Sequence, residues 1–218
     1  MASSGEETLK ILLASVLAAL LQADEAFFTT DLSVEEMETK QAVVETSKGS
    51  FVIDFLPRAA PNHVGYFLKL ASEGAYDGTT FHRVIKYGII QGGDPTTKEP
   101  GARDRYGTGG LGRLKAEFND EQHTRGAVSA VRIPGKPDSA GSQFFVCVTD
   151  QLSLDGQYTV FGRVSEGMDV VQAISEVPAD GNTIANERVE ILSVTVRDVP
   201  SADAPEAVEK IEGEDPQE

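Results

Sequence analysis

Three short strings in the chain combine arginine, glutamine, serine and phenylalanine with turn glycines. They are Phe81-His82-Arg83-Val84-Ile85, Gln91-Gly92-Gly93-Asp94 and Gly141-Ser142-Gln143-Phe144-Phe145. A guanidinium is a planar donor that is always charged, an amide both donates and accepts, and a phenyl ring is a flat apolar surface. Such groups can hold and polarise a substrate without forming a covalent bond to it. Taken alone, the three strings also fit ordinary structural elements: a strand, a Gly-Gly turn and an apolar core strand, respectively.

The signatures of covalent, nucleotide and metal chemistry are missing from the sequence. Ser142 lacks the second glycine of a nucleophile elbow, and the glycines of 107–112 are not followed by the Lys-Ser or Lys-Thr of a phosphate-binding loop. Cys147 lies in the apolar run 144–148, which favours a buried inert thiol. The three histidines have no second ligand at helical spacing, so a metal site is not expected.

Charge and length limit the possible classes of protein. The 218 residues fit one domain with extensions, and a single cysteine excludes an intrachain disulfide. The net charge of −16 sits mainly at the two ends: residues 1–41 hold eight acids and two bases, and 201–218 hold seven acids and one base. Because nucleic-acid binding depends on clustered lysine and arginine, we expect no nucleic-acid partner.

The two ends are predicted to lie outside the domain. The run Ile11–Leu21 is eleven apolar or small residues, which suits either a signal-peptide core or a docking helix, so 1–41 is an N-terminal extension of one kind or the other. No apolar run is long enough for a standard transmembrane helix. The acidic, proline-containing segment 200–218 is predicted to be a disordered tail.

Residues 42–199 are predicted to form one compact unit. Pro61 begins a helix whose apolar positions Val64, Phe67, Leu68 and Ala71 form a stripe, with Gly74 as its C-terminal cap. A second helix is predicted over 168–174. Short strands are predicted at 43–46, 50–56, 80–85, 89–91, 127–131, 143–149, 159–164 and 189–197. This pattern indicates a mainly β fold, a closed barrel with helical plugs.

A further string, Leu154-Asp155-Gly156-Gln157-Tyr158-Thr159-Val160-Phe161-Gly162, joins the other three. With all four strings, the chain resembles the cyclophilin family of peptidyl-prolyl cis–trans isomerases from about Gln41 to Arg197. The resemblance implies a closed eight-stranded antiparallel barrel capped by two helices, here with an extra N-terminal helix. It also implies an enzyme that accelerates rotation about X–Pro bonds and assists protein folding.

The resemblance assigns roles to eleven residues. Arg83 is the expected catalytic donor, and Gln91 is the expected catalytic polar residue beside it. The residues expected to bind substrate are Phe81, His82, Ile89, Val131, Arg132, Gln143, Phe145, Leu154 and Tyr158. Because isomerisation breaks no covalent bond, no metal or organic cofactor is required. The expected partners are proline-containing polypeptides, bound by a monomer that does not insert stably into a membrane.

Several positions depart from the common family pattern. Gly88 stands where many members have an aromatic residue, Ile89 where they have methionine, and Ser153 where many have tryptophan. An open pocket would suit an alternative function, a proline-peptide-binding scaffold with little turnover. The compartment is not fixed: the cytoplasm is favoured, but the protein would be exported or periplasmic if residues 1–26 are a signal peptide.

Overall fold

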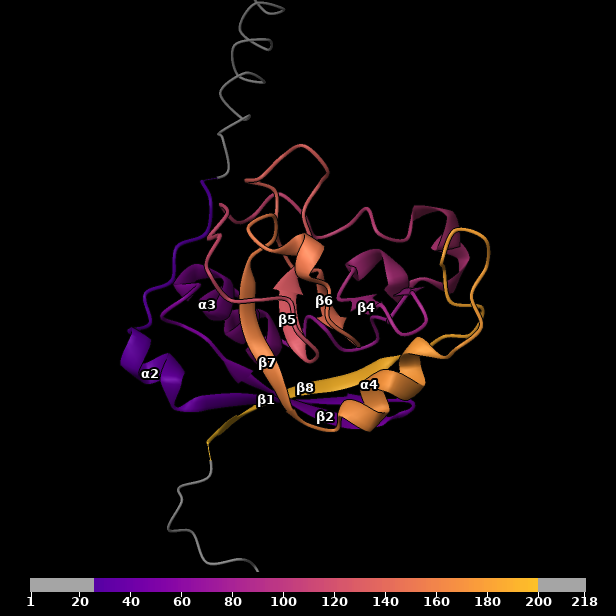
Figure 1. The fold of residues 1–218 in the computed structure, drawn as a ribbon, viewed down its shortest axis with the longest axis horizontal. Coiled ribbons are helices and arrows are strands. Elements are labelled where there is room, and N and C mark those ends of the chain that lie inside the picture. The colour runs from indigo at the N-terminus through magenta and orange to yellow at the C-terminus, as the bar shows by residue number, and fades with distance from the viewer. Residues whose placement is uncertain (1–25, 200–218) are drawn as a thin grey trace, which may run out of the picture.

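The computed structural model of the chain describes residues 26–199. The predicted signal peptide or helix at Ile11–Leu21 and the predicted acidic tail at 200–218 lie outside the described residues. Within them, eight strands form one antiparallel sheet in the order β3-β4-β6-β5-β7-β2-β1-β8 (Figure 1). The strands are β1 (Lys40–Thr46), β2 (Gly49–Phe55), β3 (Arg83–Val84), β4 (Ile89–Gly92), β5 (Ala127–Ala130), β6 (Phe144–Cys147), β7 (Val160–Glu166) and β8 (Ile191–Asp198).

The predicted fold class is confirmed as mainly β, eight-stranded and antiparallel, but a closed barrel is not confirmed. The sheet curls around its core, and its two edge strands, β3 and β8, do not pair with each other as strands. The segments beside them meet through an isolated bridge between Thr80 and Glu190 and a 2.8 Å hydrogen bond from Phe81 N to Val189 O. The two edges of the sheet therefore approach each other, but no continuous ladder of backbone hydrogen bonds joins β3 to β8.

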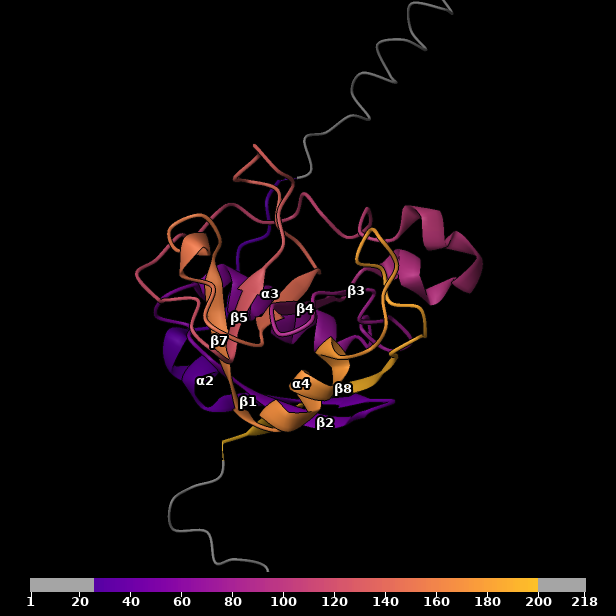
Figure 2. The same ribbon diagram turned by 45° about the vertical axis from the view of Figure 1, so that its right-hand side comes forward.

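Both predicted helices are present, α3 (Pro61–Ser72) and α4 (Met168–Ser175), and the buried hydrophobic residues of both belong to the same core cluster of the domain (Figures 1 and 2). The stripe predicted on α3 is buried, and Gly74 follows the helix with a φ of 63°. Ala60 offers no side-chain cap to the start of α3. The Glu117 carboxylate caps this end of the helix instead, accepting from the backbone N–H groups of Asn62 at 3.1 Å and His63 at 3.0 Å.

Residues 26–39 pack against helix α3, and they contain a short helix that the sequence analysis did not predict. Helix α2 (Val34–Glu38) begins with a capping box, in which Ser33 and Glu36 bond reciprocally, and it buries Met37 completely. The Phe28 ring lies 5.0 Å from that of Tyr66 on α3. The buried methionine belongs to the same core cluster as the strands, so this segment contributes to the domain's packing.

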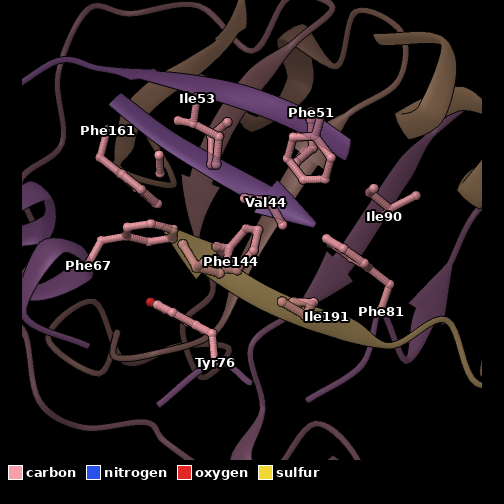
Figure 3. Close-up of a cluster of buried hydrophobic side chains, with 14 of the residues drawn as sticks. Val44, Phe51, Ile53, Phe67, Tyr76, Phe81, Ile90, Phe144, Phe161 and Ile191 are labelled. Carbon is pink, nitrogen blue, oxygen red and sulfur yellow. The ribbon is translucent and has the colours of Figure 1, made fainter. Parts of the chain in front are cut away.

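The main core lies inside the curl of the sheet. Its aromatic centre is Phe144, whose ring meets the rings of Phe67, Tyr76 and Phe81 edge to face, with ring centres 5.6 to 5.8 Å apart (Figure 3). Successive residues of β6 face opposite sides of the sheet, as strand geometry requires. Phe144 and Val146 therefore join the main core, while Phe145 and Cys147 join a second cluster on the outer face.

Three 3-10 helices complete the described part of the chain. They are η1 (Pro95–Lys98), η2 (Pro100–Arg105) and η3 (Leu152–Leu154). The segment holding η1 and η2 lies beside the loop that follows α4, and both views show the magenta and orange ribbons adjacent (Figures 1 and 2). This pairing brings two segments that are far apart in sequence next to the edge strand β3.

Candidate active site

One row of residues crosses the sheet on its outer face. Arg83 on β3 is opposite Gln91 on β4, Gln91 is opposite Phe145 on β6, and Phe145 is opposite Ser129 on β5. Residues directly opposite each other in an antiparallel sheet point to the same side. We call these four residues the outer row. The fold therefore brings the predicted donor, the predicted polar residue and the predicted aromatic floor together on one surface.

A cleft of about 730 Å³ covers this part of the outer face. Eight of the eleven predicted site residues line it: Arg83, Ile89, Gln91, Val131, Arg132, Phe145, Leu154 and Tyr158. The cleft is apolar around Phe145 and polar at Arg83 and Gln91. It can therefore accept a compact apolar ring next to a hydrogen-bonding group.

A chain of hydrogen bonds orients the Arg83 guanidinium. Gln143 Nε2 donates to the Gly109 carbonyl at 2.7 Å, so the Gln143 carbonyl oxygen faces the other way. That oxygen accepts from Gln91 Nε2 at 2.9 Å, and Gln91 Oε1 in turn accepts from Arg83 Nη1 at 3.3 Å. Because a backbone carbonyl can only accept, it fixes the orientation of both amides. Gln143 is therefore buried beneath the cleft and contacts the lining residue Gln91.

The predicted floor of the cleft, Phe145, is held by two further rings. The Tyr158 ring meets it edge on at 5.5 Å, and the His123 imidazole stacks behind it at 5.9 Å. Arg132 covers Tyr158, with its guanidinium carbon 4.7 Å from the ring centre, and donates to the Gln157 carbonyl at 2.8 Å. These contacts leave the phenyl ring little freedom, since both its edge and its back are packed.

A buried polar group supports this floor. His123 is fully buried, and its two ring nitrogens contact Asp155 Oδ1 at 2.8 Å and Ser129 Oγ at 2.9 Å. Hydrogen bonds from the His123 backbone N–H and side chain hold the pKa of the Asp155 carboxyl below its usual range. The arrangement resembles a serine–histidine–aspartate triad, but Ser129 is completely buried, which excludes a nucleophilic role.

Three predicted substrate-binding residues do not line the cleft: Gln143, which lies beneath it, and Phe81 and His82. Phe81 is fully buried in the main core, where its ring packs on Phe51 and Phe144 (Figure 3). The His82 ring lies edge on to Tyr106, beside a separate small cavity, and burial lowers its pKa. Of the string 81–83, only the Arg83 side chain faces the cleft. The other two residues support strand β3 from within.

The predicted burial of Cys147 is confirmed. Cys147 is buried beside Phe145 in the outer cluster, and burial raises the pKa of its thiol to about 12. Across residues 26–199, no group of three or more His, Cys, Asp or Glu side chains is placed to hold a metal ion. In the same range, no helix combines the length and apolar character needed to span a membrane.

The sequence analysis singled out Gly88 but gave no role to several other residues that lie at the site. The cleft is also lined by Ile85, Gly88, Gly107, Thr108, Leu111, Ile133, Pro134 and Gln151. Thr183 contacts Arg83, and His123 supports Phe145, yet both come from distant parts of the chain. The tertiary fold brings Thr183 and His123 to the site from loops, so local patterns could not identify them.

Comparison with known proteins gives a consistent result. The family model described as cyclophilin type peptidyl-prolyl cis-trans isomerase/CLD matches residues 41–196. The chain is 36% identical to peptidyl-prolyl cis-trans isomerase CYP18-2 of Arabidopsis thaliana over 159 residues, covering 72% of this chain and 94% of the relative. It is 39% identical to a peptidyl-prolyl cis-trans isomerase of Helicobacter pylori over 154 residues, covering 68% of this chain and 88% of the relative.

Solved structures agree with the sequence relatives. A cyclophilin type peptidyl-prolyl cis-trans isomerase from Cryptosporidium parvum, crystallised in the presence of the dipeptide Ala-Pro, superposes with a TM-score of 0.65 at 27% identity. The match covers 72% of this chain and 98% of that structure.

Proposed function

The chain belongs to the cyclophilin-type peptidyl-prolyl cis–trans isomerases, and we propose that it catalyses X–Pro rotation in this cleft, with Arg83 as the catalytic donor. The observation that carries this proposal is the outer row, in which a guanidinium, an amide and a phenyl ring lie side by side facing the cleft.

The reaction needs a donor more than a nucleophile. Rotating the partial double bond of a peptide requires crossing a barrier of about 18–20 kcal/mol, and the uncatalysed X–Pro step takes tens to hundreds of seconds. At the twisted transition state the prolyl nitrogen regains a lone pair. A fixed donor bonds that lone pair more strongly than it bonds the planar amide nitrogen, which lowers the barrier.

Arg83 meets this requirement through its unused atoms. Its Nε donates to Thr183 Oγ1 at 3.1 Å and its Nη1 to Gln91. No hydrogen bond within residues 26–199 uses its Nη2, so this group is available to the prolyl nitrogen. Because two of the three guanidinium nitrogens are already held, the third needs little ordering when the substrate arrives.

The apolar wall of the cleft accounts for proline recognition. We assign the pyrrolidine ring to Phe145, with Ile89, Val131 and Leu154 around it and Tyr158 at the edge of the floor. Holding this ring still lets the residue before proline turn against it. The substrates proposed are proline-containing polypeptides, a class that the Ala-Pro dipeptide used with the Cryptosporidium relative also represents.

A proline-binding scaffold with little turnover is the second candidate, favoured by Gly88 and Ser153. At Gly88 an added Cβ would lie 2.7 Å from Ile85 Cγ2, so the Ile85 side chain already occupies part of the space in which a larger residue would start. Ile85 also lines the cleft. The wall is therefore partly filled from another position, which favours the enzyme.

The two candidates separate in one experiment. The cis–trans isomerisation of a short Xaa-Pro peptide is followed with micromolar protein, and peptide binding is measured by titration under the same conditions. We expect the rate to rise well above the uncatalysed rate. Binding of the peptide without any increase in the isomerisation rate would contradict the enzyme and support the scaffold.

A further inference from the structure

The Arg83 guanidinium is held through its Nε by a residue outside the sheet. Arg83 Nε donates to the hydroxyl of Thr183 at 3.1 Å, and that hydroxyl donates onward to the Asn182 carbonyl at 2.5 Å. Since the hydroxyl proton is used toward Asn182, its oxygen is left to accept from the guanidinium. Gln91 and Thr183 therefore hold Arg83 from two sides.

Thr183 adopts an uncommon backbone conformation. Its φ is 65°, in the left-handed region that β-branched residues rarely enter. Such conformations persist only where the surrounding structure imposes them, and they concentrate at functional sites. Here the imposed geometry aims the Thr183 carbonyl at Val84 N, at 2.9 Å, while its side chain reaches Arg83.

The loop around Thr183 is fixed to strand β3 and to itself. Ala185 N donates to the His82 carbonyl at 2.9 Å, and Ile184 forms an isolated bridge with Arg83. Within the loop, the Asp180 carboxylate accepts from Asn182 N at 2.9 Å and from Ile184 N at 3.0 Å. These bonds make residues 180–185 an extension of the sheet edge.

A single arginine from another segment joins the two ends of this loop. Arg103 on η2 donates through Nη1 to the Ala185 carbonyl at 2.5 Å. Its Nη2 donates to Asp180 Oδ2 and to the Ile184 carbonyl, both at 3.2 Å. Arg103 thus fixes both sides of Thr183 without touching the cleft.

We propose that Thr183 is a positioning residue for the catalytic guanidinium, and that Arg103 holds the loop that presents it. The inference rests on the proposed function of Arg83. The Thr183 hydroxyl restricts rotation about the Arg83 side chain, so that Nη2 stays aimed at the prolyl nitrogen. Neither Thr183 nor Arg103 contacts substrate.

The test removes the hydroxyl while keeping the shape of the side chain. Thr183→Val keeps β-branching at the same φ, so we expect kcat to fall about tenfold with KM within about twofold, as for a misaligned catalytic group. Thr183→Ser restores the hydroxyl and is expected to recover activity to within about twofold of wild type. Thr183→Ala, which relaxes the backbone, should lose as much as the valine variant.

Two arginine variants extend the test to the loop. Arg103→Met should lower kcat about threefold, and Arg105→Met, which removes an exposed arginine that pairs with Glu99 at 3.5 Å, should leave it unchanged. Urea unfolding of each variant gives the folded fraction used to correct the rates. Unchanged kcat in Thr183→Val, or an equal loss in Thr183→Ser, would overturn the inference.

Arg83→Ala measured in parallel separates the two claims. If Arg83→Ala loses activity while Thr183→Val does not, only the positioning role fails. If Arg83→Ala itself remains active, the proposed catalytic role fails and Thr183 has nothing to position.

Discussion

Two neighbouring rows of the sheet differ by one position along each strand and have opposite roles. The outer row is Arg83, Gln91, Phe145 and Ser129, whereas the adjacent inner row is Val84, Ile90, Val146 and Val128. Every residue of the inner row is aliphatic and at most 2% exposed, and all four belong to the main core. The outer row carries polar groups and the ring that forms the floor of the cleft.

The difference shows how a small β domain can separate stability from chemistry. Because side chains alternate with a period of two, each strand serves both functions, and a register slip of one residue would exchange them. The dense inner row fixes the register, and the fixed register aligns Arg83, Gln91 and Phe145. Precise placement of the site therefore depends on residues that never touch the cleft.

The largest expected effect comes from the two adjacent phenylalanines of β6. Phe144→Ala empties the centre of the main core and should lower the free energy of unfolding by about 3–5 kcal/mol. Phe145→Ala should cost less stability, since water in the cleft can replace part of the ring, but should lower kcat/KM at least about tenfold.

Urea unfolding and peptide isomerisation of both variants provide the comparison. The rates are divided by the folded fraction, after which Phe144→Ala is expected to match wild type. If Phe144→Ala loses as much activity as Phe145→Ala after this correction for the folded fraction, the separate roles of the two faces of the sheet are contradicted.

A smaller effect on stability is expected from Glu117, whose carboxylate caps the start of helix α3. Burial raises the pKa of this carboxyl, but the hydrogen bonds from His63 and Asn62 outweigh it, and the net pKa lies below the ordinary value of 4.5. A lowered folded-state pKa means that the carboxylate stabilises the fold above pH 4.5 and that this contribution is lost as the pH falls further. Glu117→Gln should cost about 1–3 kcal/mol at pH 7.

The pH dependence is the diagnostic part of this prediction. The stability difference between Glu117→Gln and wild type should shrink as the pH is lowered below 4.5. Glu38→Gln, which removes an exposed pairing with Arg58, is the matched control and should change stability little. A difference that stays constant between pH 7 and pH 3 would show that the charge of Glu117 does not matter.

A further prediction concerns Cys147, whose reactivity reports whether the outer cluster opens. A thiol with a pKa of about 12 instead of 9.0 has about a thousandfold less thiolate at pH 8. Labelling of the native protein with a thiol reagent should therefore be at least about a thousandfold slower than labelling in denaturant. Rapid labelling of the native protein would mean that Phe145 and its neighbours do not form a closed layer.

The sequence predicted those features that depend on local periodicity. The eight strands, the α3 stripe at Val64, Phe67 and Leu68, and helix α4 appear where they were expected. Arg83, Gln91 and Phe145 were assigned to the site through the resemblance to the cyclophilin family, which four short strings carry together. Closure of the barrel was overstated, because strand count alone does not say whether the edges pair.

Features that depend on distant segments were missed. Helix α2 has a capping box at Ser33 and Glu36, but five residues give too short a pattern to predict. Phe81 and His82 were expected at the cleft because they precede Arg83, whereas their side chains are buried elsewhere. Thr183 lies 100 residues from the arginine that it contacts, and no local signal connects them.

The most direct test of the account is the effect of Arg83→Ala on catalysis and binding separately. Removing one positioned donor should lower kcat/KM for an Xaa-Pro peptide by about two to three orders of magnitude. The dissociation constant of the peptide should stay within about threefold, because the apolar wall around Phe145 remains. Arg58→Ala, an exposed arginine outside the cleft, serves as the control. An Arg83→Ala variant within about threefold of wild-type kcat/KM would contradict the central claim.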